Sequence, residues 1–305
     1  MTAAPPAKTA PLAVPATVAA TAPPAARYSP AAAFWRHLAR KRSAQFGGLT
    51  LAALVFFALT GTRLLPHDPF DVAPEQRLQP PSAQYWFGTD ELGRDLFSRV
   101  AYGSRFTLMI GLLTVSIAAI GGVLIGLPAA YYGGWADMLV MRLVDIMLSF
   151  PYILLTLAIV AIIGPSLTNA MIAIGVAGIP GYARLVRSSV LAVKEQDFVE
   201  AARALGTPSL RIMFRTILPN VISPIIVFVS LGAPTAVLAA AALSFLGLGA
   251  QPPLPEWGAM MVNARTFTVT ASWVVLAPGL AIFVVVLGLN LLGNALRDVL
   301  DPRTR

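Results

Sequence analysis

The chain alternates between long apolar stretches and short polar ones. Four stretches contain no charged residue, at 106–136, 146–183, 216–255 and 266–296. A further, largely apolar run at 46–65 follows a cluster of basic residues. Since about 20 apolar residues cross a hydrocarbon core about 30 Å thick, this pattern predicts a protein that crosses a membrane several times.

The stretch 146–183 is too long for one span, and Gly164, Pro165 and Ser166 divide it with a strong turn signal. At about 1.5 Å per residue, each half forms a helix long enough to cross. We therefore expect an all-α membrane protein. Its six transmembrane helices are predicted at about 46–65, 106–131, 146–163, 167–187, 219–247 and 273–295.

The distribution of positive charge orients these spans. With both termini in the cytoplasm, the cytoplasmic segments hold 16 Lys and Arg residues and the outer segments hold 6. Cytoplasmic loops carry an excess of Lys and Arg, so we expect cytoplasmic N- and C-termini. A disordered Ala- and Pro-rich tail at 1–34 then precedes a transmembrane domain at 35–305. This domain has an outer loop at 66–105 and a cytoplasmic loop at 188–218.

The composition agrees with a membrane protein and excludes several kinds of site. Hydrophobic residues make up 57% of the chain and charged residues 12%, and the mean hydropathy is +0.73. There is no cysteine, and the two histidines, His37 and His67, are far apart, so neither a disulfide nor a metal site is indicated. The net charge of +8 agrees with the excess of Lys and Arg that membrane proteins carry in their cytoplasmic loops, so no nucleic-acid partner is expected.

The placement of the charged residues also limits the chemistry. None lies deep in an expected span, which argues against a proton or sodium relay and leaves no base to activate a serine. None of the three lysines, Lys8, Lys41 and Lys194, follows a glycine, so the phosphate-binding pattern G-x-x-x-x-G-K-[ST] is missing. We expect no catalytic residue and no cofactor in this chain, and energy for any transport must come from another subunit.

A polar block at 194–220 interrupts the apolar pattern and carries helix punctuation. Asp197 and Glu200 have the spacing of a capping box, and Gly206 is suited to end that helix. The threonine and proline that follow suit the N-cap and first turn of a second helix. An apolar stripe at helical spacing comes next, formed by Leu210, Met213, Phe214 and Ile217.

Two interpretations of this block are open from its residues alone. It could be a well-capped loop that only links two spans. Alternatively, it could be a short helix that docks in a groove of a partner protein, which is a common mode of recognition. The small side chains of Ala201 and Ala202 would let such a groove approach closely.

The sequence "EAARALG", followed by "LP" twelve residues after its glycine, resembles the EAA loop of ABC importer permeases. The corresponding residues here are Glu200, Ala201, Ala202, Arg203, Gly206, Leu218 and Pro219. Thr216 departs from the general pattern, in which an isoleucine is usual. The sequences "FGTDELGRDLFSRVAYGSR", "RLVDIMLSFPYILL", "ALSFLGLGAQPPLPEWG" and "LGNALRDVLDPR" resemble the C-type subunit of the dipeptide/oligopeptide/nickel permeases. The resemblance covers about 35–303.

This resemblance implies the type I ABC importer permease (MetI-like) fold in a bacterial cytoplasmic membrane. It implies that the EAA loop forms a coupling helix seated in a cytoplasmic ATPase subunit. The implied partners are a second homologous permease, two ABC ATPase subunits that bind ATP and Mg, an extracytoplasmic substrate-binding protein, and membrane lipid. The implied cargo is a di- or oligopeptide, with nickel or another small solute as the alternative. A secondary transporter or a membrane scaffold is less expected.

Several other polar residues carry weaker expectations. Asp95 and Arg99 are spaced as a helix ion pair. Their segment, with Leu92, Leu96 and Val100 on one face, would lie at the outer membrane surface or help to receive the binding protein. Arg142 and Asp145 are expected to pair at the cytoplasmic start of the third span. Six small polar residues are expected to pack between helices, and one or two of them could instead line the passage. They are Ser149, Asn169, Ser230, Thr235, Ser244 and Asn290.

Overall fold

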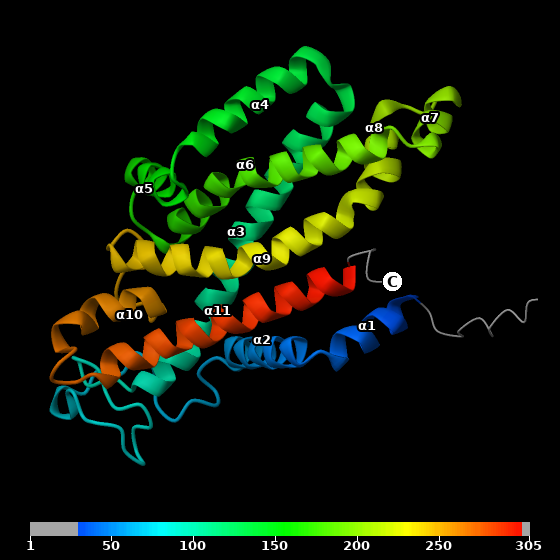
Figure 1. Ribbon diagram of the computed structural model, residues 1–305. Coiled ribbons are helices and arrows are strands. Elements are labelled where there is room, and N and C mark those ends of the chain that lie inside the picture. Colours follow the sequence, from blue (N-terminus) through cyan, green and yellow to red (C-terminus); the bar gives the residue numbers. More distant parts are fainter. Residues whose placement is uncertain (1–29, 301–305) are drawn as a thin grey trace, which may run out of the picture.

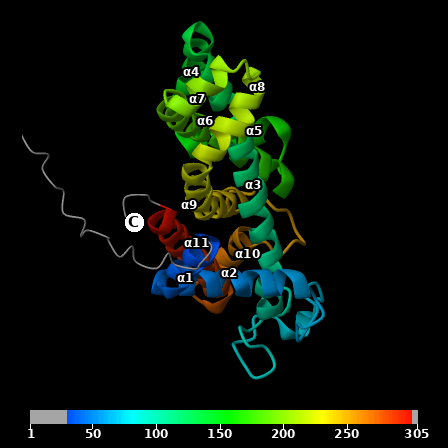
Figure 2. The same ribbon diagram turned by 90° about the vertical axis from the view of Figure 1, so that its right-hand side faces the viewer.

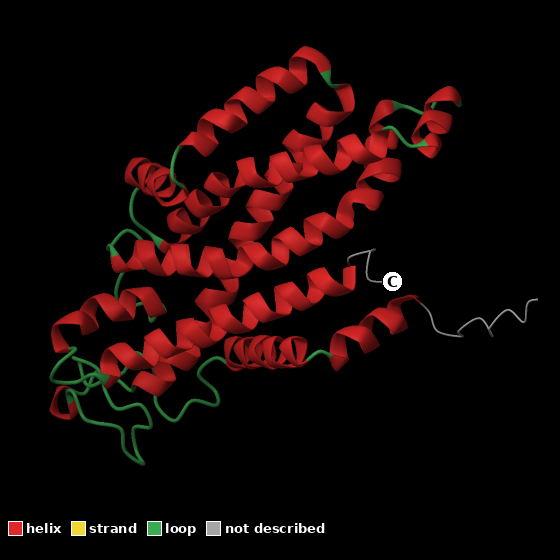
Figure 3. Cartoon of the chain, viewed as in Figure 1, coloured by secondary structure: helices red, strands yellow, loops and turns green. Residues whose placement is uncertain are grey.

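The computed structural model describes residues 30–300, and its regular elements are helices (Figure 3). The first part of the chain forms α1 (Pro30–Arg40), α2 (Arg42–Thr60), the short η1 (Pro74–Gln76) and α3 (Leu96–Tyr132). The middle forms α4 (Gly134–Ser149), α5 (Tyr152–Ile163), α6 (Leu167–Lys194), α7 (Asp197–Ala204), α8 (Ser209–Arg211) and η2 (Ile212–Ile217). The last part forms α9 (Leu218–Phe245), α10 (Trp257–Ala264), η3 (Arg265–Phe267) and α11 (Trp273–Leu300).

Five helices of the described chain are long and apolar enough to cross a membrane, and there are six if a bent pair counts as one span. The five are α2, α3, α6, the helix that runs through α8, η2 and α9, and α11. The bent pair is α4 and α5, whose axes differ by 94°. The expectation of one straight helix at 146–163 is therefore not met. Proline disfavours helical geometry in the residue before it, and Phe150, before Pro151, is extended.

The two ends of the described chain lie at the same end of the helix bundle. Figure 1 shows α1 and the end of α11 on the side that also carries α7 and α8, whereas α5, α10 and the segment 61–95 lie on the opposite side. The view turned by 90° shows α1, α2 and α11 together at one edge and α4 to α7 at the other (Figure 2). The predicted tail lies outside the described residues up to position 29, and α1 begins within its last positions.

Small residues let the central helices pack closely. A Cβ atom added at Gly122 of α3 would lie 2.3 Å from Tyr182 Cβ on α6, and one at Gly126 would lie 2.4 Å from the carbonyl oxygen of Ala183. In the same way, a Cβ at Gly47 of α2 would lie 2.4 Å from the carbonyl oxygen of Gly288 on α11. Close approach through small residues is typical of helices packed in membranes, and here it fixes the frame that carries the loops.

Several polar side chains within the helices donate hydrogen bonds to backbone carbonyl groups close to them in the chain. Ser230 and Asn290 donate hydrogen bonds to carbonyl groups three and four residues earlier in α9 and α11. Asn169 donates to the carbonyl oxygens of Ile163 and Gly164, which closes the turn between α5 and α6. Ser244 is different because it is buried at the end of α9 and accepts a hydrogen bond from the backbone of Ala250.

Candidate coupling loop and outer polar network

The first helix of the polar block, α7, begins one residue before the expected position. Gln196 is its N-cap residue, no side chain caps the helix, and Asp197 is already helical. The predicted capping box is therefore wrong, because Asp197 lies inside the first turn. Its carboxylate and that of Glu200 still lie at the positive end of the helix dipole, where negative charge is favourable.

Gly206 ends α7 as predicted. Its φ of +71° is left-handed. The backbone N–H of Gly206 donates to the carbonyl oxygen of Arg203 at 2.9 Å, and that of Thr207 donates to Ala202 at 3.1 Å. These two bonds form the Schellman motif. A Cβ atom added at Gly206 would meet nothing within 4 Å, so glycine is required here by backbone conformation and not by lack of space.

The second helix of the block starts later than predicted and then widens. Pro208 is the N-cap of α8, and Thr207 caps nothing with its side chain. The chain then forms a π-helix at Ile212–Ile217 that leads directly into α9. Leu218 and Pro219 are therefore the first residues of α9, which continues directly from the π-helix.

The wide turn also changes which residues are buried. Met213 and Ile217 are buried as the predicted stripe requires, but Leu210 is 65% exposed and Phe214 is 42% exposed. Ile212 is buried in their place. A π-helix has more residues per turn than an α-helix, so residues five positions apart, such as Ile212 and Ile217, share a face.

Apolar burial fixes the loop to the ends of α3 and α6. Val199 of α7 has no exposed surface and belongs to a cluster with Leu127 of α3, Val190 of α6 and Met213 of the π-helix. The Arg203 guanidinium lies over the ring of Tyr131, 5.2 Å from its centroid. The loop is therefore a small rigid unit on a helical frame.

The remaining surface of the loop is open. Glu200, Ala201 and Pro219 are exposed, and Ala202 and Leu218 are partly buried. Leu205, beside the glycine, is 85% exposed although it is apolar. These are the residues that the sequence singled out for contact with a partner, except for Leu205, whose exposure the sequence pattern did not indicate.

Two ion pairs tie α4 to α6 at the same end of the molecule. Asp137 accepts two hydrogen bonds from Arg187, both at 2.6 Å. Asp145 pairs with Arg184 at 2.5 Å. The predicted pair between Arg142 and Asp145 is therefore wrong: Asp145 pairs across to α6 and not along its own helix.

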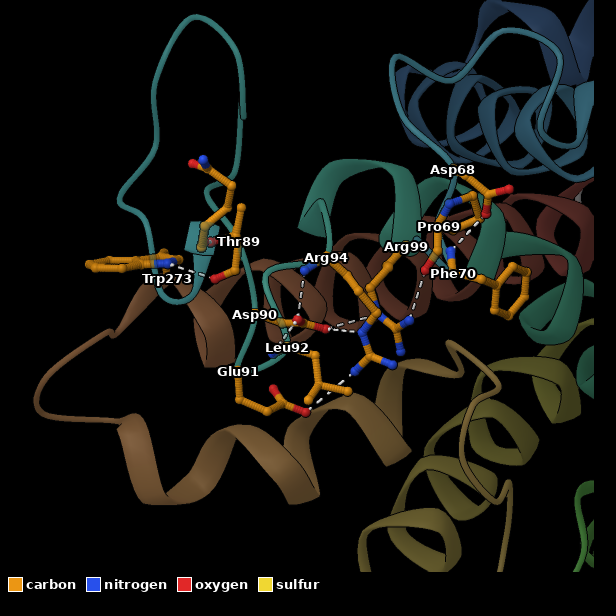
Figure 4. A network of polar contacts seen from close by, with 11 residues as sticks. Asp68, Pro69, Phe70, Thr89, Asp90, Glu91, Leu92, Arg94, Arg99 and Trp273 are labelled. Carbon is orange, nitrogen blue, oxygen red and sulfur yellow. Dashed lines mark hydrogen bonds and ion pairs between the residues drawn. The ribbon is translucent and has the colours of Figure 1, made fainter. Parts of the chain in front are cut away.

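A second polar cluster lies at the opposite end and centres on the buried carboxylate of Asp90 (Figure 4). One oxygen accepts backbone hydrogen bonds from Leu92 and Arg94, each at 2.9 Å. The other lies 2.6 Å from Arg94 Nε and 3.4 Å from Arg99 Nε. We call these residues, together with Glu91, the outer network. It closes the turn that leads into α3.

Asp95 and Arg99 do not form the predicted pair. Asp95 caps α3, where it accepts hydrogen bonds from Ser98 N at 3.1 Å and Ser98 Oγ at 2.6 Å. Arg99 pairs with Asp90 and donates to the carbonyl oxygen of Pro69 at 2.9 Å. The segment before Leu96 is a turn and not an amphipathic helix, because the backbone N–H groups of Leu92 and Arg94 donate to the Asp90 carboxylate.

The outer network also connects distant parts of the chain. The carbonyl oxygen of Thr89 accepts a hydrogen bond from Trp273 Nε1 at the start of α11 (Figure 4). The Thr89 hydroxyl accepts a hydrogen bond from Gln79 N at 2.8 Å and donates one to the carbonyl oxygen of Gln76. The loop between α2 and α3 is thus held against α3 and α11.

Comparison with protein families gives two matches that together cover most of the chain. A family model described as the inner membrane component of binding-protein-dependent transport systems matches residues 122–305. A second, described as the N-terminal transmembrane domain of oligopeptide transport permease C, matches residues 29–81.

Individual relatives agree with these matches. The dipeptide transport system permease protein DppC of Alkalihalophilus pseudofirmus is 48% identical, over 91% of each chain. The di/tripeptide permease protein DppC of Pseudomonas aeruginosa is 46% identical, over 91% of this chain and 93% of the relative. The glutathione permease protein GsiD of Pectobacterium atrosepticum is 44% identical, over 91% and 92%.

A solved structure of the MetNI methionine ABC transporter in inward-facing conformations shares the fold. The TM-score is 0.53 at 20% identity, and the match covers 66% of this chain and 96% of that one.

Proposed function

The chain belongs to the family of inner membrane components of binding-protein-dependent transport systems, and we propose that it is the translocation subunit of an ATP-driven importer of di- and oligopeptides. The relatives named above are permeases for dipeptides, di/tripeptides and glutathione, and all of these are short peptides. The chain itself offers no phosphate-binding loop, so in this proposal it moves the cargo while partner subunits bind ATP and Mg and hydrolyse the ATP.

The open surface of the α7 loop is the observation that carries the proposal. Leu205 is 85% exposed on a loop that Val199 and the Gly206 cap hold rigid. Such a loop can transmit movement from a partner, because a force applied to its exposed residues reaches α3, α6 and α9 through buried contacts. We assign Glu200, Ala201, Ala202, Arg203, Gly206, Leu218 and Pro219 to coupling with the ATPase.

We further propose that the bundle crosses the membrane six times, with α4 and α5 as one broken span, and that the α7 end faces the cytoplasm. The excess of Lys and Arg at that end supports this orientation. One coupling loop serves one ATPase, and two ATPases act together, so a second homologous permease completes the passage. ATP shifts the complex between its two states because it binds the closed ATPase dimer more tightly.

Uptake by living cells tests the assigned cargo. We would delete only this gene, restore it on a plasmid, and measure the uptake of labelled di-, tri- and pentapeptides and of nickel. Loss of peptide uptake with unchanged nickel uptake, reversed by the plasmid, is the expected result. Loss of nickel uptake alone would replace the cargo and keep the architecture, and no change in either would overturn the assigned cargo.

A further inference from the structure

A cavity of about 460 Å³ opens beside the outer network. Three parts of the chain enclose it: the turn that leads into α3, the connection between α9 and α10, and one face of α10. Its wall includes Glu91, Leu92, Arg94, Arg99, Gln251 and Asn263. Its volume falls in the range of about 300–1,000 Å³ that is typical of small-molecule sites. None of the coupling residues lies in its wall.

Two nearly buried arginines supply the positive charge of this cavity, and the carboxylates of Asp90 and Glu91 lie beside them. The side chains of Arg94 and Arg99 are 7% and 4% exposed, and Figure 4 shows them lying next to each other with Asp90 alongside. A guanidinium carries five N–H donors and no acceptor, so the pair needs many acceptors. Arginines placed together in this way suit a carboxylate or a phosphate, which can accept two parallel hydrogen bonds.

The acceptors that the chain supplies are too few for these donors. Arg99 donates one hydrogen bond, to Pro69, and its buried Nε makes none, because Asp90 lies 3.4 Å away. Arg94 is well paired with Asp90 at 2.6 Å but reaches Glu91 only at 3.4 Å. Within the described chain, Arg94 Nη1 and Arg99 Nη2 make no hydrogen bond, so the two guanidiniums keep unused donors for an anionic oxygen.

The rest of the wall suits a short organic molecule. Leu254, Ala259 and Met260 give it an apolar side, while Asn263 adds an amide at its edge. Glu256 is not part of the wall, and its carboxylate accepts hydrogen bonds from the backbone of Gly258 and Ala259. Burial raises the pKa of this carboxyl group.

We propose that this cavity is an extracytoplasmic subsite for the carboxylate end of a short peptide. The proposal rests on the function proposed above, because a peptide released at the outer surface would meet this end of α9 and α10. The two guanidiniums bind the carboxylate, and the apolar wall contacts the last side chain. Glu91 competes with the ligand for Arg94 and thereby weakens its binding.

Direct binding without the binding protein tests this subsite. We would place the complete complex of permeases and ATPases in nanodiscs and titrate it with labelled dialanine and with dialanine amide, which lacks the carboxylate. Dialanine is expected to bind at least tenfold more tightly than the amide. Equal binding of the two, or no saturable binding of dialanine, would overturn the proposal.

A pair of variants with a matched control locates the site. Leu92→Trp narrows the cavity and is expected to weaken dialanine binding by about tenfold or more. Val72→Trp is the control, because Val72 is also an exposed apolar residue of the outer loop but does not line the cavity. Equal affinity of Leu92→Trp and Val72→Trp for dialanine would show that the peptide binds elsewhere.

Glu91→Gln removes the competing carboxylate and leaves the Asp90 pairs in place. It is expected to tighten dialanine binding about threefold to tenfold and to leave the amide unchanged, and weaker binding of dialanine would contradict the proposal. Peptide transport by the wild-type complex with its binding protein is measured in parallel. Absence of that transport would refute the proposed function. Normal transport, with dialanine binding unchanged in both Leu92→Trp and Glu91→Gln, would refute only the subsite.

Discussion

The two ends of the molecule hold their loops in opposite ways. At the α7 end, apolar burial and one glycine cap fix a loop whose outer surface is left open, as the 85% exposure of Leu205 shows. At the other end, charge fixes the loop: Asp90, Arg94 and Arg99 are buried and pair mainly among themselves. The first loop therefore leaves an open surface, which the proposed function assigns to a partner protein, whereas the second is held in shape by its own charge pairs.

Removal of the carboxylate at the centre of the outer network tests this contrast most strongly. Asp90→Ala leaves two buried guanidiniums without their shared acceptor, and loss of one partner of a buried ion pair costs about 3–5 kcal/mol. We expect a lower melting temperature of the purified complex and rapid proteolysis of the segment 61–95. The exposed Asp71→Ala in the same loop is the control. Equal stability of the two variants would show that the network does not hold the outer loop.

The glycine that caps α7 comes next in expected effect. A side chain at the φ of +71° found at Gly206 costs about 1–2 kcal/mol, and β-branched residues tolerate this region poorly. Gly206→Val should therefore distort the loop and reduce the recovery of ATPase subunits with the permease. Gly206→Asn is the matched variant, since asparagine adopts this conformation readily. If both variants lost the ATPase to the same extent, the cause would be a side chain that blocks the contact at position 206 and not the backbone conformation.

The structure of each end could be predicted from the sequence only where the residues that fix it are close together in the chain. The apolar runs and Gly206 act locally, so they predicted helices close to the observed α2, α3, α6, α9 and α11, and the end of α7. The contacts around the outer network join residues far apart in the chain: Arg99 donates to Pro69, and Trp273 donates to Thr89, next to Asp90. Helical spacing suggested the wrong partner for Arg99. The break at Pro151 had a local signal, because proline disfavours helical geometry in the residue before it. The signal alone does not predict a break, since prolines also lie inside α3, α6, α9 and α11.

The π-helix had no such signal. Its sequence, Ile212–Ile217, fits an α-helical stripe as well as any, and only packing against α3 and α6 determines which residues are buried. Leu205 was missed for a related reason. Its position after Ala204, at the end of α7, predicts nothing about exposure, which depends on how α7 packs against α3 and α6.

A change at Leu205 should affect the fold least, and it tests the contrast between the two ends of the molecule most directly. Leu205→Glu changes a side chain that is 85% exposed, and substitutions at such surfaces usually alter stability by less than about 0.5 kcal/mol. The matched variant is Leu64→Glu, because Leu64 is 64% exposed on the outer loop at the opposite end. Both proteins should insert and melt like the wild type. Only Leu205→Glu should lose the ATPase subunits and peptide uptake, because it places a charge where an apolar contact is expected. If Leu205→Glu retained both, the open surface of α7 would not be the coupling surface, and the contrast between the two ends would concern folding alone.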